Sequence, residues 1–467
     1  MKISRKNFLK LGLAGAAGLV LPFGASACGT READSGSTGV LVRSTATLPE
    51  PFGVPLPIPP VLKPVRSDAT TDYYEITQRR GKAEILPGFT TEIWGYNGIF
   101  PGPTIEARSS RRAVVRHRNE LPVPTVVHLH GGITPPEHDG YPTSLVLPVD
   151  GWEAGNTGHA TGDLSHGVKD YVYPLDQPAA TLWYHDHRMD FTGPQVYRGL
   201  AGFHLVRDDQ EEALPLPKGE REIPLMICDR AFAEDGSFRY PSVEPTLQGD
   251  PGVTRNFMRG VLGDVILVNG ASWPFLEVTN ARYRFRILNA SNARRYCLAL
   301  DPPPRQGPAF VQVGSDVGLL GWPVSHEEIE IAPAERFDVV VDFSTYPIGT
   351  QVTLVNQFGD STTGRVMRFH VTRQARDDSV VPFRLIEVER LTRSAATVTR
   401  RFRFARGPGG GGRVIWTING EPFDPERVDT QPQLGATEIW RLTTNVHHPV
   451  HLHLAHFQVL TRRGRSL

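Results

Sequence analysis

The sequence predicts an all-β protein built from about three domains in tandem. A length of 467 residues, at roughly 150 residues for each domain, leaves room for three separate cores. The 46 glycines and 40 prolines favour short strands joined by turns. Runs rich in β-branched and aromatic residues follow one another along the chain, and no amphipathic helix of ordinary length is predicted.

Clusters of Gly, Pro, Asn and Asp separate the predicted strands. In chain order these strands cover residues 126–130, 181–187, 202–208, 264–270, 282–288, 337–343, 365–371, 413–420 and 438–444. A weak internal repeat supports three related units, because an Asn-Gly step lies between two predicted strands in each third of the chain. These steps are Asn97-Gly98, Asn269-Gly270 and Asn419-Gly420.

The domain boundaries follow from shifts in composition. We expect a signal segment at 1–28, a linker with a proline-rich strap at 29–66, and domains at 67–210, 211–376 and 377–467. The glycine run 409–412 is expected to form the tip of a hairpin in the third unit.

The charge balance excludes one class of partner. Lys and Arg together number 50, as do Asp and Glu, so the formal net charge is zero. Binding to a phosphate backbone relies on an excess of basic side chains. We therefore expect no nucleic-acid partner, and we expect a soluble, monomeric body beyond the first 30 residues.

The N-terminus has the layout of an export signal. Basic residues precede an apolar stretch at 11–23, and small residues follow at 25–27. Residues 4–10 resemble the twin-arginine motif, but Lys6 replaces the second arginine, so the export route stays open. We expect the protein to be exported, whether to the periplasm, to the cell surface or to the medium.

The three cysteines leave alternatives open. Cys28 directly follows the small residues, as either a lipoprotein cysteine that tethers the protein to a membrane or a plain residue of the leader. Cys228 and Cys297 lie in strand-like runs. They are interpreted as two buried thiols or, in an exported protein, as a disulfide.

Three groups of histidines point to a metal site. His-x-His pairs occur at His128 and His130 and again at His185 and His187, in apolar strand-like runs. Residues two apart in a strand project from the same face, so each pair places two imidazoles side by side. One pair alone is explained as well by surface or hydrogen-bonded histidines, but three such pairs are not. The third group is His448, His451 and His453.

The third group has one additional feature. His448 precedes His451 by three residues, an odd offset that directs it to the opposite side of an extended segment. The group can therefore serve two metal sites. Imidazole binds copper, zinc, iron and nickel, so the histidines alone do not identify the metal. Because the second unit contributes no pair, we expect a multinuclear site between the first and third units.

Nearly the whole mature chain resembles the multicopper oxidases, in the branch of bacterial spore-coat laccases and bilirubin oxidases. The resemblance rests on segments such as WGYNGIFPGPTI, HLHGGITPPEHDGYP, LWYHDHRMD, APAERFDVVVDF and HPVHLHLAHFQVL. It implies three cupredoxin-like β-sandwich (Greek-key) domains. It also implies copper as cofactor, a small-molecule electron donor of the phenolic or bilirubin-like kind, and reduction of O2 by four electrons to water.

The resemblance also assigns roles to individual residues. It implies a mononuclear type 1 copper with His448 as a ligand, and a trinuclear cluster of one type 2 and two type 3 coppers. The implied cluster ligands are His128 and His451 for type 2, His130 and His185 for one type 3 copper, and His187 and His453 for the other.

Two acidic residues lie close to these histidines in the sequence. Asp139 matches the family's acidic residue near the cluster that helps proton delivery, and its alternative interpretation is a turn-forming Asp before Gly140. Asp186 is interpreted as an orienting or structural group rather than a ligand. The unpaired histidines are expected to be solvated or core residues: His117, His138, His159, His166, His204, His326 and His370. His447 and His456 do not match ligand positions.

The fourth copper motif of the family, a His-Cys-His triplet, is absent. Only 14 residues follow His453, and no cysteine is flanked by histidines. In the family this motif supplies the thiolate of type 1 copper and the third imidazole of each type 3 copper. We therefore expect a C-terminally truncated chain with an incomplete third domain, inactive as written. It is either a fragment of an ordinary enzyme or a naturally shortened chain.

Rival functions remain at this stage. The alternative is a non-catalytic copper-binding or scaffold protein on the same fold. A zinc hydrolase is disfavoured because it needs an open zinc site with a general base. A cuprous-ion oxidase is disfavoured because the chain has only five methionines.

Overall fold

A computed structural model describes residues 39–152, 162–241, 253–254, 260–408, 414–462 and 465–466. The predicted signal segment, Cys28, His159 and the glycine run 409–412 lie outside the described residues. None of the helices in the described part of the chain combines the length and the apolar composition needed to cross a bilayer.

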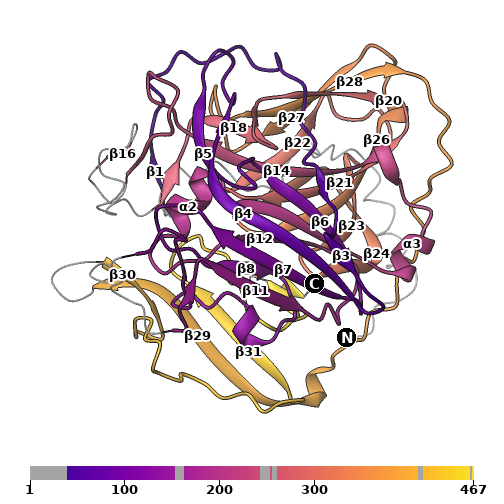
Figure 1. Ribbon diagram of the computed structural model, residues 1–467. Helices are drawn as coiled ribbons and strands as arrows, with labels where there is room; N and C mark the ends of the chain where they lie inside the picture. Colours follow the sequence, from indigo (N-terminus) through magenta and orange to yellow (C-terminus); the bar gives the residue numbers. More distant parts are fainter. Residues whose placement is uncertain are drawn as a thin grey trace, which may run out of the picture.

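The first unit consists of two five-stranded sheets (Figure 1). Strands β11 (Val168–Tyr173), β7 (Arg112–Asn119), β4 (Thr71–Ala83), β3 (Arg66–Ser67) and β5 (Thr91–Tyr96) form one sheet. The other contains β2 (Val61–Leu62), β6 (Gly102–Arg108), β13 (Ala201–Arg207), β12 (Ala180–Asp186) and β8 (Val127–His130). In β7, exposed and covered residues alternate, with buried Ala113, Val115 and His117 on one face. Both sheets contribute to a core that includes Trp94, Val115, Leu129 and Leu182.

The second unit has a sheet of seven strands and a sheet of five strands. The larger contains β19 (Ala271–Ser272), β18 (Val265–Val268), β14 (Glu222–Arg230), β21 (Arg282–Asn289), β26 (Arg336–Asp342), β23 (Phe310–Ser315) and β24 (Gly318–His326). The smaller contains β20 (Phe275–Thr279), β28 (Arg365–Arg373), β27 (Gln351–Asn356), β22 (Tyr296–Asp301) and β25 (Glu328–Ile331). Phe285, Val339 and Phe369 join its core, which continues into Trp183 and Phe203 of the first unit. The first two units therefore share a hydrophobic core.

The third unit is a single three-stranded sheet with a short hairpin. Its strands are β30 (Val414–Ile418), β29 (Ala396–Pro408) and β31 (Thr437–Thr444), and the hairpin is β32 (Thr461–Arg462) with β33 (Arg465–Ser466). Strands β29 and β30 pair antiparallel, with Pro408 opposite Val414. Among the described residues from 377 onward, only Ser379, Leu385 and Thr417 are buried. Within the described chain this sheet therefore has no packed second layer.

Short elements connect the sheets. Short parallel pairs also form outside the larger sheets, namely β1 (Val40–Leu41) with β17 (Val261–Leu262), β9 (Val146–Leu147) with β10 (Ser165–His166), and β15 (Tyr240–Pro241) with β16 (Val253–Thr254). In the described part of the chain, the α-helices are α2 (Thr192–Arg198) and α3 (Asp209–Ala213), and the 3-10 helices are η1 (Pro136–His138), η3 (Gly219–Arg221), η5 (Phe343–Thr345) and η6 (Arg393–Ala395).

The two cysteines in strands differ from each other. Cys228 on β14 is a fully buried free thiol, and burial raises its pKa to about 11. Cys297 on β22 is also buried, but it is disulfide-bonded. The interpretation of two buried thiols is therefore confirmed for Cys228 and wrong for Cys297. A disulfide between these two residues is excluded.

Candidate metal centre

Strand pairing places the first two histidine groups side by side. Strands β8 and β12 are antiparallel neighbours, and His185 lies directly opposite His128. His130 lies opposite Trp183, and His187 follows the end of β12. Because side chains two apart in a strand share a face, both pairs project from the same side of the sheet.

The third group joins these pairs from a segment more than 300 residues later. The Nε2 atoms of His128 and His451 are 3.2 Å apart. The ring of His451 stacks on that of His130, with centroids 3.7 Å apart. The ring of His453 stacks on that of His128 at 4.1 Å. The segment after β31 therefore closes the site that β8 and β12 begin.

Six imidazoles form one cluster. The Nδ1 atom of His130 lies 3.4 Å from Nε2 of His185. The ring centroid of His187 lies 5.1 Å from that of His128 and 5.2 Å from that of His453. Two sets of three histidines each bring their ligand atoms within 4.8 Å of one another, as required around one metal ion. These sets are His128, His451 and His453, and His128, His130 and His185.

His448 is not part of this cluster. Its side chain is exposed, and its ring packs against Trp416 with centroids 4.7 Å apart. Its Nδ1 lies 2.6 Å from the main-chain oxygen of Pro449. The structure thus brings together six of the seven predicted histidines and leaves His448 apart, as its odd offset from His451 suggests.

Five of the six clustered imidazoles are neutral at physiological pH. Burial lowers the pKa of His128, His130, His185 and His187, and neighbouring imidazoles lower it further. Burial also lowers the pKa of His451 to about 2, with further contributions from His128 and His453. Neutral imidazole is the form that binds metal.

Asp139 holds two of these rings in place. Its Oδ2 accepts a hydrogen bond from Nδ1 of His453 at 2.6 Å, and its main-chain oxygen accepts one from Nδ1 of His128 at 2.5 Å. Burial alone would raise the pKa of Asp139, but the hydrogen bonds from both histidines lower it. With Nδ1 acting as donor in each ring, both Nε2 lone pairs stay free for a metal.

Asp186 has a structural role in the strand. Its carboxylate accepts hydrogen bonds from the main-chain N–H groups of Val126 and Arg188, each at 3.0 Å. Burial raises its pKa to about 7. The main-chain oxygen of Asp186 accepts from Nδ1 of His185 at 2.8 Å, which directs Nε2 of that ring into the cluster. The Asp186 carboxylate therefore fixes the main chain at Val126 and Arg188 and is not placed as a metal ligand.

The cluster fits a cation that prefers nitrogen ligands. His128, His185 and His453 each use Nδ1 in a hydrogen bond to oxygen, which points Nε2 inward. The Nδ1 atom of His187 is buried and has no hydrogen-bond partner among the described residues. Imidazole-rich sites of this kind suit copper and zinc.

Two residues of the site walls were not predicted from the sequence. Trp183 packs on His185 and His130, with ring centroids 4.1 and 5.2 Å away. Its position two residues before His185 in the same strand is a signal that was available in the sequence. Arg336 of the second unit lies against Gly131, next to His130. Arg336 is not adjacent in sequence to any of the clustered histidines, so no sequence pattern indicated this contact.

The remaining histidines lie apart from the cluster ligands. His117 and His204 are buried in the first core, where burial lowers the pKa of each to about 3. His166 is exposed, and Nε2 of His326 lies 2.9 Å from Oε1 of Gln312. Nε2 of His456 donates to the main-chain oxygen of Gly131 at 3.1 Å. The burial of His117 and His204 and the exposure of His166 agree with the expectation of core or solvated positions.

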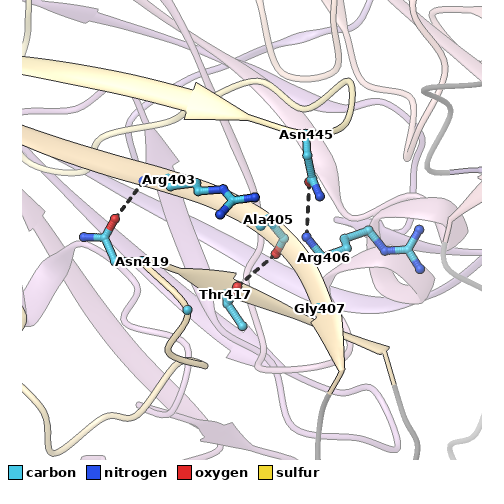
Figure 2. A pocket seen from close by; sticks show the side chains of 8 residues that line it. Arg403, Ala405, Arg406, Gly407, Thr417, Asn419 and Asn445 are labelled. Atoms are coloured by element: carbon cyan, nitrogen blue, oxygen red, sulfur yellow. Dashed lines mark hydrogen bonds between the residues drawn. The ribbon is translucent and has the colours of Figure 1, made fainter.

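A surface pocket of about 460 Å³ lies on the third sheet. Figure 2 shows Arg403 and Ala405 of β29 beside Thr417 of β30 and the turn residue Asn419. The main-chain N–H of Arg403 donates to Asn419 at 2.8 Å. None of the seven predicted histidines lines this pocket, so it is separate from the metal centre.

Comparison with known proteins identifies the family. Residues 77–211 and residues 390–466 each match a family model described as multicopper oxidase. A laccase of Bacillus stratosphericus is 40% identical over 452 residues, which cover 89% of this chain and 84% of the relative. A bilirubin oxidase of Albifimbria verrucaria is 34% identical, over 96% of this chain and 78% of the relative.

Solved structures agree with the sequence relatives. The crystal structure of a laccase from Pediococcus acidilactici superposes with a TM-score of 0.71 at 31% identity, over 86% of this chain and 78% of that one. The similarity therefore covers the β-sandwich units as well as the histidine motifs. It confirms the resemblance read from those motifs: the chain belongs to the multicopper oxidase family of oxidoreductase enzymes.

Proposed function

We propose that the six clustered histidines bind copper, and that the family reaction of this protein oxidises a phenolic or bilirubin-like donor while O2 is reduced by four electrons to water. The observation that carries this proposal is the convergence of His128 and His130 with His451 and His453 from the opposite end of the chain. Bound copper would supply the one-electron steps between donor and O2. The names of the laccase and bilirubin oxidase relatives support the donor class.

The proposed ligand assignment follows the contacts within the cluster. His128 and His451, whose Nε2 atoms are 3.2 Å apart, would hold type 2 copper. His130 and His185, in contact at 3.4 Å, would hold one type 3 copper. His187 and His453, with ring centroids 5.2 Å apart, would hold the other. His448 would serve the type 1 site, and its separation from the cluster supports a different centre.

Asp139 is proposed to have two roles in the reaction. Its hydrogen bonds to His453 and His128 support a role in orienting both rings. A second role, delivery of protons to reduced O2, is proposed because the carboxylate lies directly behind two cluster ligands. Its place at the end of η1 also accounts for the turn before Gly140, so the structural and functional interpretations are compatible.

The 467-residue chain by itself is proposed to bind copper without forming a type 1 site. No cysteine among the 467 residues is flanked by histidines. His448, the proposed histidine ligand of type 1 copper, is exposed beside Trp416. Type 1 copper needs a thiolate, which also gives it an intense blue absorption band. Turnover with laccase substrates is therefore expected to be negligible for this chain.

Copper loading of matched variants tests the proposal. The native chain is expected to bind copper and to show the paramagnetic resonance of Cu2+ with nitrogen ligands, without the intense blue band. His451→Ala is expected to lose copper from the cluster, whereas His448→Ala keeps it, because only His451 contacts His128 and His130. Equal copper content in the two variants would contradict the ligand assignment. An intense blue band in the native chain would contradict the absence of a type 1 site.

A second candidate is a non-catalytic copper-binding protein on the same fold. The histidine cluster supports metal binding by this chain, with or without turnover. Sequencing of the gene beyond codon 467 separates the two candidates. A His-Cys-His motif in frame would support the oxidase, and a stop codon with no such motif would support the non-catalytic protein.

The cellular site is also a proposal. The N-terminal basic and apolar segments support export. The chain is proposed to be a monomer, and Cys28 is the proposed lipid attachment point in molecules whose Cys28 sulfur is not part of a disulfide. Cell fractionation, with fatty-acid labelling of the native chain and of Cys28→Ser, tests both parts. Label that survives Cys28→Ser would contradict the tether, and protein confined to the cytoplasm would contradict export.

A further inference from the structure

Arg336 connects the second unit to the metal centre. It is the first residue of β26, and its side chain is only 2% exposed. Its Nε donates to the main-chain oxygen of Thr181 at 3.0 Å. Thr181 lies on β12 of the first unit, four residues before the cluster ligand His185. The second unit therefore contacts a strand that carries ligands, although it supplies no histidine.

The guanidinium also lies against the peptide that follows His130. A Cβ atom built on Gly131 would lie 2.7 Å from Nη2 of Arg336. That nitrogen cannot easily withdraw, because it donates to the main-chain oxygen of Asp316 at 2.6 Å, while Nη1 donates to that of Ala334 at 2.8 Å. Gly131 also has a φ of +89°, which favours glycine. The sequence thus leaves room for a fixed positive charge directly behind His130.

The third unit contacts the same peptide. The main-chain oxygen of Gly131 accepts hydrogen bonds from Nε2 of His456 at 3.1 Å and from Nε2 of Gln177 at 3.2 Å. The peptide that follows His130 is therefore contacted by Arg336 of the second unit, by Gln177 of the first and by His456 of the third.

We propose that Arg336 is a positioning residue of the metal centre, which fixes the main chain of His130 and favours Cu+ over Cu2+ at the copper held by His130. The inference rests on the proposed copper function. A fixed positive charge repels Cu2+ about twice as strongly as Cu+, since Coulomb energy scales with the product of the charges. It therefore favours the product of the one-electron reduction of Cu2+ to Cu+.

Asp316 provides the opposing charge. Its Oδ1 lies 3.0 Å from Nη1 of Arg336, and its side chain is 44% exposed. Loss of this carboxylate would leave the guanidinium uncompensated. Changes to the two partners should therefore shift the copper redox equilibrium in opposite directions, which a purely structural role for the ion pair does not predict.

The test compares variants of the full 467-residue chain loaded with copper. The ratio of Cu+ to Cu2+ is measured by electron paramagnetic resonance in a titration with a reductant of known potential. At a fixed potential we expect Arg336→Gln to lower the ratio by about tenfold, the size of effect expected when a unit charge near the metal is removed from a medium of intermediate dielectric. Asp316→Asn is expected to raise it several-fold, and Arg336→Lys to keep it close to native.

The controls separate charge from folding. Arg365→Gln removes an exposed charge from β28 and is expected to leave the ratio unchanged. Shifts of Arg336→Gln and Asp316→Asn in the same direction, or no shift in either, would overturn the inference. If Arg336→Gln does not fold, the direction of the shift in Asp316→Asn decides. A native chain that binds no copper would reject both this inference and the proposed function, whereas copper binding without opposite shifts would reject the inference alone.

Discussion

Asp139 forms hydrogen bonds with metal-centre histidines from two distant parts of the chain. It belongs to the turn after η1 in the first unit, and its carboxylate reaches Nδ1 of His453 in the third. The main-chain oxygen of Asp139 accepts a hydrogen bond from Nδ1 of His128. Metal-binding histidines depend on such outer partners for ring orientation and basicity. The carboxylate of Asp139 therefore orients the His453 ring, and its main-chain oxygen orients the His128 ring.

Substitution of Asp139 by Asn should weaken copper binding without unfolding the first unit. The amide can still accept from His453, but it lacks the charge that strengthens the bond. We expect copper affinity to fall by roughly 10- to 100-fold, measured by competition with a chelator. Asp150→Asn, at an exposed position, serves as the control. Equal affinity of the two variants would show that Asp139 does not support the ligands.

At the scale of elements, the pairing of β8 with β12 creates half of the centre. The register sets His185 opposite His128, and a slip of one residue would turn one pair to the other face of the sheet. The loop that carries Asp139 packs closely behind β8. A Cβ atom on Gly140 would lie 2.2 Å from the main-chain oxygen of Val127, and Gly140 has a φ of +83°. Only glycine fits between this loop and the strand.

Gly140→Ala should therefore lower both stability and copper content. The positive φ costs about 1 kcal/mol for alanine, and the clash with Val127 adds about 1 to 3 kcal/mol. Gly151→Ala isolates the first contribution, because Gly151 has a φ of +92° but no atom within 4 Å of its added Cβ. Denaturant titration of both variants gives the difference. If Gly151→Ala is as destabilising as Gly140→Ala, close packing behind β8 is not the cause.

At the scale of the whole molecule, an ionic cluster joins the first and second units. Arg286 of β21 donates from Nε to Glu222 at 2.5 Å and from Nη1 to the hydroxyl of Thr181 on β12 at 2.9 Å. Arg207 of β13 also donates to Glu222 at 2.5 Å. Breaking a buried pair of this kind leaves an unpaired charge away from water, which is strongly destabilising. The interface therefore depends on Glu222 staying ionised.

Acid should weaken this interface over a defined pH range. Burial alone would raise the pKa of Glu222, but Arg286 and Arg207 lower it from 4.5 to about 2. A lowered pKa adds stability that is present above the unfolded value and is lost as the pH falls toward the folded value. The free energy of unfolding should therefore decrease between about pH 4.5 and 2, by up to about 3 kcal/mol from this group.

Glu222→Gln tests the origin of that slope. The variant is expected to be less stable than the native chain at neutral pH and to lose less stability between pH 4.5 and 2, measured by denaturant titration at each pH. Glu92→Gln, in an exposed pair with Arg80 at 3.2 Å, should leave the slope unchanged. An unaltered slope in Glu222→Gln would exclude this carboxylate as the source.

Particular residues show how far the sequence could predict the site. His-x-His spacing in apolar runs was sufficient to predict that His128, His130, His185 and His187 share a face, because strand geometry is local. The separate placement of His448 also followed from its odd offset. Arg336 could not be predicted, because its contact with Gly131 depends on how the second unit packs on the first.

The sequence by itself determined the all-β class, the metal-binding histidine pairs and the family, since strand periodicity and ligand spacing are properties of short segments. Only the tertiary structure decided which imidazoles meet. It placed His451 against His128, set Asp139 as the hydrogen-bond partner of His128 and His453, and brought Arg336 behind His130. It also showed that the described part of the third unit forms one uncovered sheet. These features depend on contacts between residues distant in sequence, which packing of the units creates.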